Sequence, residues 1–378
     1  ADTGGAGSGS GGRVQPPATA PYSNPGGSLG LETAPRPTQA SALTGLDTGG
    51  LPRDHLIGAG PELSEELVMW VSLPEDLEDA PTLPPGEEPT RYYWRALAYN
   101  VYAGRGWSST RTSRTEYDKN EWTIRREELI PPDAPDGDLL LPGQDLVEQE
   151  VRLFSEEPAN LVFAAGDILT VDHEFEIAWR RLGEQPGGPE SSWAGRDFFG
   201  ASVSTNRYRV RSLRPAPGVE GLRSAGSQYP EWVLERYLQL PEEVPGRVRR
   251  LSQELTATAP TPYDRAAAIE RYLRRFPYSL DVPAPPEDRD VADFFLFDLQ
   301  QGYCDYYATS MVVLSRAAGL PARLAVGYAG GDYDPEQGRY VVSQAEAHSW
   351  PEIFFPGYGW VPFEPTAGLA APDRPDAG

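Results

Sequence analysis

One cysteine, one histidine and one glutamate follow one another along the second half of the chain in the order of a thiol nucleophile, its base and an orienting acid. Cys304 is the only cysteine among the 378 residues and lies at the start of a predicted helix. His348 is the only histidine of the second half and lies in a predicted strand, and Glu364 ends the next predicted strand. These residue types in this order are typical of acyl chemistry through a thioester.

The position of Cys304 at the start of a helix favours its use as a nucleophile. An ordinary thiol has a pKa of about 8.5 and is mostly protonated at neutral pH. The helix dipole and the unpaired N–H groups of the first turn stabilise a thiolate, and the same N–H groups can receive the oxyanion of a tetrahedral intermediate. The alternative is that Cys304 is a small buried core residue, as most free cysteines are.

The base and the acid also have ordinary alternatives. His348 could make only a structural hydrogen bond, and Glu364 could be a solvated acid in a loop. As members of the site, His348 would accept the thiol proton, and the Glu364 carboxylate would hold the imidazole tautomer and stabilise its cation. Glu346 is a rival for the acid, because it precedes His348 by two residues and such positions share a strand face. Asp332 and Asp334, in a glycine-rich turn, are weaker candidates.

Aromatic side chains crowd this part of the sequence and could line a substrate cleft or form plain core. Tyr303 and Trp350 are close in sequence to the candidate nucleophile and base, so we assign them possible supporting roles. The other aromatic residues are Tyr306, Tyr307, Tyr358 and Trp360.

Charge and cysteine content exclude several classes of function. The formal net charge is −23, from 33 Lys and Arg against 56 Asp and Glu. Such a surface repels phosphate backbones, so we expect no nucleic-acid partner, and anionic membrane surfaces are disfavoured too. One cysteine makes neither an intrachain disulfide nor a Cys₂His₂ or Cys₄ zinc site, and the three histidines are dispersed. We therefore expect no metal and no cofactor. No apolar run approaches the roughly 20 residues that span a bilayer.

The first part of the chain divides into a linker and a β-rich region. Residues 1–58 are rich in Gly, Ser, Pro, Ala and Thr without periodic apolar positions, which predicts a flexible linker. Residues 59–215 contain short aromatic and β-branched runs separated by turn clusters, which predict a sandwich or barrel-like domain. The predicted strands include Leu67–Val71, Tyr92–Leu97, Trp122–Ile124, Val151–Leu153, Leu161–Phe163, Phe175–Ile177 and Tyr208–Arg211.

From residue 216 to 368 the pattern changes to helices followed by strands, which is typical of an α+β fold. Thr261 as N-cap and Pro262 as first residue predict the start of one helix. The helix that begins at Cys304 is predicted to reach about Ala318, with Gly319 just beyond its end. Its predicted inward stripe is Cys304, Ala308, Met311, Val312 and Ser315. Four strands follow, near 323–328, 339–343, 348–355 and 360–363, and residues 369–378 resemble a second linker.

Five motifs in this order resemble the bacterial transglutaminase-like superfamily, specifically its TgpA-type membrane proteins. They are Gly302-Tyr-Cys304, Arg316-Ala-Ala-Gly-Leu-Pro-Ala-Arg323, Gly327-Tyr328, Glu346-Ala-His348-Ser-Trp350 and Gly359-Trp-Val-Pro-Phe-Glu364-Pro-Thr. The resemblance implies a papain-like core with Cys304 as nucleophile, His348 as base and residue 364 as the third member. It also implies an extracytoplasmic segment, periplasmic or extracellular, of a membrane protein that is tethered by segments absent from this chain.

The chain departs from the family pattern at two places. The acid is commonly Asp, where this sequence has Glu364, and the nucleophile is often followed by Glu-His, where this sequence has Asp305 and Tyr306. Neither change removes the nucleophile or the base. We therefore predict thiol-dependent acyl transfer or hydrolysis at peptide or glutamine-type amides, as an acyltransferase or a cysteine peptidase or amidase, with a peptide or protein substrate at the cell envelope. The alternative is an inactive transglutaminase-like module that binds ligands there.

Overall fold

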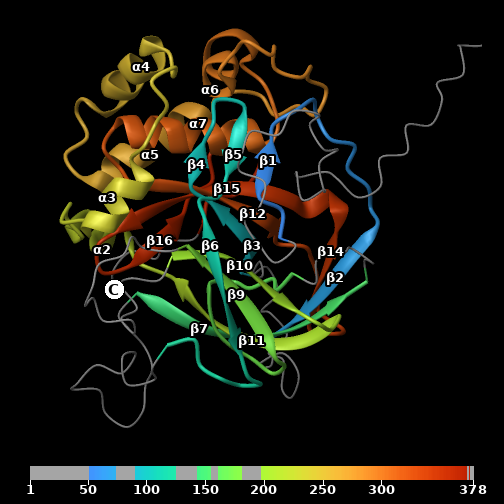
Figure 1. Cartoon of the computed structure of the whole chain (residues 1–378). Coiled ribbons are helices and arrows are strands. Elements are labelled where there is room, and N and C mark those ends of the chain that lie inside the picture. The colour runs from blue at the N-terminus through green and yellow to red at the C-terminus, as the bar shows by residue number, and fades with distance from the viewer. Residues whose placement is uncertain are drawn as a thin grey trace, which may run out of the picture.

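Strands and helices occupy different parts of the molecule (Figure 1). The computed structural model describes residues 51–73, 90–124, 143–154, 161–180, 197–372 and 374. Within these residues, all pairings between named strands are antiparallel. Figure 1 shows most of the helices at one end, with α7 (Cys304–Ala317) beside β15 (Ala347–Phe355), a small group of strands level with α7, and most of the other strands below. The predicted α+β class, with a strand-rich first part, is confirmed.

Three sheets carry the described strands. A seven-stranded sheet has the order β16 (Gly359–Pro362), β15 (Ala347–Phe355), β12 (Ala322–Ala329), β3 (Tyr93–Tyr99), β10 (Asp197–Val203), β9 (Phe175–Arg180) and β6 (Thr112–Tyr117). A six-stranded sheet has the order β13 (Asp332–Asp334), β14 (Arg339–Ser343), β2 (Leu67–Ser72), β7 (Gln144–Leu153), β11 (Arg207–Pro215) and β8 (Asp167–Val171). A small sheet has the order β1 (Asp54–Leu56), β5 (Gly106–Ser108) and β4 (Val101–Tyr102).

The helices begin and end largely where their capping residues predict. They are α2 (Val219–Ser224), α3 (Glu231–Tyr237), α4 (Gly246–Thr256), α5 (Pro262–Leu273), α6 (Val291–Phe294), the π-helix η4 (Phe295–Leu299), α7 (Cys304–Ala317) and the 3₁₀-helix η5 (Gln344–Glu346). At the start of α5, the Thr261 side chain accepts a hydrogen bond from the Asp264 N–H at 3.1 Å, as an N-cap does. Beyond α7, Gly319 has a φ of 78°, which favours glycine after a helix end.

The expected boundary near residue 215 separates two stretches of sequence but not two sheets. β3 lies between β10 and β12, so the seven-stranded sheet contains strands from both sides of the boundary. β14 lies beside β2 in the six-stranded sheet, with the same consequence. One hydrophobic cluster extends from Leu51 to Phe363 and unites both parts. The candidate site is therefore built on strands from both halves of the chain.

Three of the predicted segments differ in the structure. Residues 51–58 are not linker, because β1 pairs with β5 and the side chains of Leu51 and Ile57 are buried. The stretch Trp122–Ile124 is not a strand: Thr123 and Ile124 form a bend, and the backbone N–H and side chain of Thr123 donate to the carbonyls of Leu169 and Ile168. The stretch 161–163 forms only an isolated bridge, between Leu161 and Ser202. Residues 1–50, 373 and 375–378 of the predicted linkers lie outside the described residues.

Helix α7 is buried on every side over residues 304–316, and the predicted single inward stripe is wrong. Its surroundings explain this, because α4, α5, α6, β12 and β15 all contact it. A helix that is apolar or paired all round is typical of a core position. Two of its polar side chains are bonded within this core: Thr309 accepts from the Trp107 indole at 2.9 Å, and Arg316 donates to the Asn100 carbonyl at 2.8 Å.

A buried ion cluster joins the β-rich part to α3. Asp197 and the Arg180 side chain have no exposed surface, and Arg180 Nη1 lies 2.8 Å from Asp197 Oδ1. Arg236 and the Tyr237 hydroxyl also donate to this carboxylate. Arg180 further donates to the Phe198 carbonyl at 2.7 Å. Such a cluster is stable only when complete, because removal of one partner leaves a buried charge uncompensated.

We expect Asp197→Ala to lower the free energy of unfolding by roughly 3–5 kcal/mol, because Arg180 would keep its charge in the core. The control is Glu148→Ala, which removes a cross-strand pair with Arg211 whose side chains are 33% and 47% exposed. That loss should stay below about 1 kcal/mol. Urea unfolding of both variants is the measurement, and equal losses would contradict the role of Asp197.

Candidate active site

Cys304 is the first residue of α7, and its side chain is buried, with 4% exposed. The N-cap residue, Tyr303, has an extended backbone and makes no side-chain cap, so no side chain occupies the first-turn N–H groups in the way a capping residue does. Gly302 leaves little room before it: a Cβ at this position would lie 3.0 Å from the Tyr306 ring and 3.2 Å from the Phe295 ring. The start of α7 is therefore tightly held while its N–H groups stay uncapped.

His348 and Glu364 lie together because their strands are neighbours. His348 is near the start of β15, and Glu364 follows the end of β16, which pairs with β15. The distance between His348 Nε2 and Glu364 Oε2 is 2.8 Å, and both side chains are buried. Because Nε2 bonds to the carboxylate, Nδ1 is the ring nitrogen left for a thiol, and Cys304 is close enough to raise the pKa of His348.

The electrostatics favour a charged pair. Burial disfavours the imidazolium, but the Glu364 carboxylate and the hydrogen bond with Cys304 outweigh it and raise the pKa of His348 to about 10. Burial likewise disfavours the carboxylate, but the attraction of His348 and its hydrogen bond, with the bond from the Thr366 N–H, hold the pKa of Glu364 below its usual range. At neutral pH, the pair is therefore an imidazolium beside a carboxylate.

Tyr93 completes the surroundings of this pair and was not singled out by the sequence. Its hydroxyl donates to Glu364 Oε2 at 2.9 Å across 271 residues of sequence. Burial and Glu364 raise the pKa of Tyr93 well above its usual value, so the hydroxyl keeps its proton. Trp350 stacks on the His348 ring at a centroid distance of 6.1 Å, and its buried Nε1–H has no hydrogen-bond partner among the described residues. The Tyr93 and Trp350 rings together fix the plane of the His348 imidazole.

A second buried histidine contacts the residue that follows Cys304. His55, on β1, has no exposed surface, and its Nε2 lies 3.0 Å from Asp305 Oδ1. The Gly58 carbonyl accepts hydrogen bonds from Tyr303 at 3.3 Å and from Tyr306 at 3.1 Å. The segment 55–58 thus binds three residues around Cys304. No local pattern signalled these contacts, because the segment ends the stretch 1–58, whose overall composition is that of a linker.

One exposed aromatic side chain lies beside the nucleophile. Tyr278 is 43% exposed, and its backbone pairs with Gly302 in a parallel bridge. The neighbouring Ser279 N–H donates to the Gly302 carbonyl at 2.8 Å. Burial, together with Cys304 and Asp305, raises the pKa of Tyr278 above its usual value. Tyr278 is therefore placed to contact a molecule that approaches Cys304.

The rival acids make no hydrogen bond with His348. Glu346 belongs to η5 and not to the strand, so the predicted shared strand face with His348 is wrong. Its Oε2 accepts from the Ser343 N–H at 2.6 Å and the Ser343 hydroxyl at 2.7 Å, which is a capping box. Asp332 and Asp334 lie in β13, paired with β14.

The other aromatic residues of the sequence analysis divide between two places. Tyr306 and Tyr307 are fully buried in the core around α7, whereas Tyr358 and Trp360 line a separate pocket. Within the described ranges, no group of three or more His, Cys, Asp and Glu side chains is placed to hold a metal ion. No helix in these ranges has the length and apolar character that a membrane crossing needs.

Sequence comparison identifies relatives across most of the chain. The profile of the transglutaminase-like superfamily matches residues 249–365. The uncharacterized protein YebA of Bacillus subtilis is 30% identical over 309 residues, which cover 75% of this chain and 38% of that protein. A protein-glutamine gamma-glutamyltransferase of Pseudomonas aeruginosa is 29% identical over 301 residues, which cover 78% of this chain and 38% of that protein. The chain thus spans less than two fifths of the length of both relatives.

The periplasmic domain of TgpA from Pseudomonas aeruginosa has a similar fold. Its crystal structure aligns with a TM-score of 0.55 and 26% identity over 84% of this chain and 93% of that chain. The crystal structure of the same domain bound to ethylmercury gives a TM-score of 0.52. The family predicted from the five motifs is confirmed: the chain belongs to the transglutaminase-like superfamily, as a bacterial protein of the TgpA type.

Proposed function

We propose that the chain catalyses thiol-dependent acyl transfer or hydrolysis at peptide or glutamine-type amides, with Cys304, His348 and Glu364 as its triad. The observation that carries the proposal is the 2.8 Å bond between buried His348 and Glu364, beside Cys304 at the start of α7, where no side chain caps the helix. This arrangement supports the roles of nucleophile for Cys304, base for His348 and orienting acid for Glu364.

In the first half of the reaction, the Cys304 thiolate attacks the amide carbonyl and a C–S bond forms. The first-turn N–H groups of α7 are the donors for the oxyanion. The C–N bond then breaks, and the His348 imidazolium gives its proton to the leaving ammonia or amine. A thioester on Cys304 and a neutral imidazole remain. Throughout this step, the Glu364 carboxylate holds the ring and stabilises its charged form.

In the second half, water or a primary amine attacks the thioester, and His348 takes the proton of the attacking group. The C–S bond breaks and the thiolate returns. Water gives hydrolysis, and an amine gives a new amide bond. The name of the Pseudomonas relative, a protein-glutamine gamma-glutamyltransferase, supports glutamine-type amides as substrates and amines as acceptors.

We also propose that this chain is an extracytoplasmic segment of a membrane protein and acts on a peptide or protein at the cell envelope. The proposal is supported by the similarity to a periplasmic domain over 93% of that domain. The curated relatives are much longer than the matched region, which leaves room in them for membrane segments.

Substitution of the triad tests the activity directly. We expect Cys304→Ala to abolish ammonia release and amine incorporation on glutamine peptides, and Glu364→Gln to slow both roughly 10²- to 10⁴-fold, because the imidazole loses its orienting charge. Glu346→Gln is the matched control and should retain activity, because Glu346 bonds to Ser343. Activity in a folded Cys304→Ala protein, or an equal loss in Glu346→Gln, would refute the assignment.

The pH profile tests the raised pKa of His348. The imidazolium is the form that gives a proton to the leaving amine, and it is lost as the pH rises through about 10. We therefore expect kcat to hold at alkaline pH and to fall only near this value. In Glu364→Gln the carboxylate that raises the pKa is absent, so the alkaline limb should move to lower pH. The profile of kcat against pH in both proteins measures this, and an unmoved limb would contradict it.

The contact between His55 and Asp305 predicts a positioning role. We expect His55→Leu to lower kcat and the rate of Cys304 alkylation by iodoacetamide roughly 10- to 100-fold with KM unchanged, because the start of α7 loses a tether. His55→Gln keeps a donor for Asp305 and should recover part of the loss. Leu56→Ala changes an exposed neighbour on the same strand and serves as control. A similar fall in this control would show a general effect of β1.

A further inference from the structure

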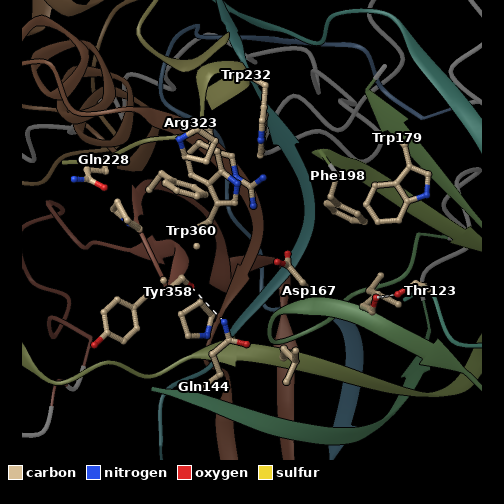
Figure 2. Close-up of a pocket in the computed structure, with 18 residues that line it drawn as sticks. Thr123, Gln144, Asp167, Trp179, Phe198, Gln228, Trp232, Arg323, Tyr358 and Trp360 are labelled. Carbon is tan, nitrogen blue, oxygen red and sulfur yellow. Dashed lines mark hydrogen bonds between the residues drawn. The ribbon is translucent and has the colours of Figure 1, made fainter. Parts of the chain in front are cut away.

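A pocket separate from the candidate triad lies where the two large sheets meet α3 and the turn between β15 and β16. Its volume is about 340 Å³, at the lower end of the range for small-molecule sites. Neither Cys304, His348 nor Glu364 lines it. The pocket therefore offers a place for a ligand that does not occupy the reactive centre (Figure 2).

The walls of this pocket are aromatic. Figure 2 shows Trp232 and Trp360 on one side and Trp179 and Phe198 on the other, with Asp167 between them. Trp360 is supported from behind by Tyr237, with ring centroids 4.4 Å apart. Rings that are fixed in this way present flat apolar faces at little cost in conformational entropy.

The charges at the pocket cancel one another. Arg323 lies over the Trp360 ring at 4.3 Å and donates to Glu352 at 2.7 Å. Arg95 donates to the same carboxylate at 3.0 Å and also to Asp167. Two guanidinium groups thus face two carboxylates. The Arg323 cation opposes the binding of a cation among the rings, and Asp167 opposes the binding of an anion, so the pocket favours a neutral ligand.

The polar groups of the pocket favour a ligand that carries hydrogen-bond donors. Gln144 is only 7% exposed, and its Oε1 has no hydrogen-bond partner among the described residues. Its Nε2 contacts the Tyr358 carbonyl at 3.5 Å, shown as a dashed line in Figure 2. The Asp167 side chain is 33% exposed and accepts only. Because Gln144 Oε1 is closed to solvent, the acceptor that a ligand reaches from the pocket is the half-buried Asp167 carboxylate, and a ligand that donates to it gains a hydrogen bond.

From these features, we infer that the pocket binds a neutral saccharide. Arg323 covers the Trp360 ring, so the apolar face of a sugar ring is matched by the rings of Trp232 and Trp179. Its hydroxyl groups donate to Asp167 and accept from the exposed Gln228 amide. A proline-rich peptide also docks on aromatic grooves, but proline has no N–H to donate to Asp167. A saccharide satisfies both the walls and the acceptor.

The experiment measures binding of N-acetylglucosamine, its β-1,4-linked disaccharide and maltose to the 378-residue chain by ligand-observed NMR and calorimetry. Choline and a proline-rich peptide are the competing classes of ligand. We expect saturable binding of at least one saccharide and neither competitor. Trp232→Ala should weaken this binding at least tenfold, because it removes an aromatic wall, and Asp167→Asn several-fold, because one accepting oxygen becomes a donor while the acceptor for Arg95 is kept.

Two controls keep the test decisive. Trp70→Ala removes a half-buried tryptophan that lies on β2 outside the pocket, and it should bind as the unchanged protein does. Cys304→Ala should also bind normally, which separates the pocket from the catalytic proposal. Circular dichroism and thermal unfolding check that each variant is folded. The inference is overturned by binding of none of the saccharides, by preference for choline or the peptide, or by equal losses in Trp70→Ala and Trp232→Ala.

Discussion

The buried Glu364 carboxylate is the group on which the candidate site depends. Taking a carboxylate out of water costs several kcal/mol unless partners replace its hydration. Here Oε2 accepts from His348 and Tyr93, and Oε1 accepts from the Thr366 N–H at 2.9 Å. Its own backbone N–H donates to Glu270 at 2.8 Å. Strands β3 and β15 and helix α5 supply these partners, so the ionised carboxylate that bonds to His348 depends on all three elements.

Strand β15 connects the candidate site with other buried features of the same sheet. Alternate residues of a strand share one face, and on β15 these are His348, Trp350, Glu352 and Phe354. His348 belongs to the candidate site, Glu352 accepts from Arg95 and Arg323, and Phe354 lines the aromatic pocket. The Trp350 ring lies against the rings of both His348 and Tyr93. One face of β15 therefore carries the candidate base His348, the Glu352 carboxylate that pairs with two arginines, and Phe354 in the wall of the pocket.

Local features of the fold could be predicted, whereas its long-range pairing could not. Thr261 and Pro262 fix the start of α5, and Gly319 fixes the end of α7, because caps act within a few residues. The insertion of β3 between β10 and β12 depends on pairing between residues more than 200 positions apart, such as Val326 with Leu97. No local pattern encodes such a register, so the sequence indicated two successive units where the sheets are shared.

The same distinction applies to the candidate site. Cys304, His348 and Glu364 are recognisable because their chemistry requires particular residue types in a particular order, at a helix start and at strand ends. Glu346 was misplaced because spacing by two assumes a strand, whereas a capping box with Ser343 turns the chain into a 3₁₀-helix there. Tyr93 and His55 have no such signature: they contact Glu364 and Asp305 across 271 and 250 residues. Their role arises from the need to pair buried charges, and burial is a property of the assembled sheets rather than of any segment.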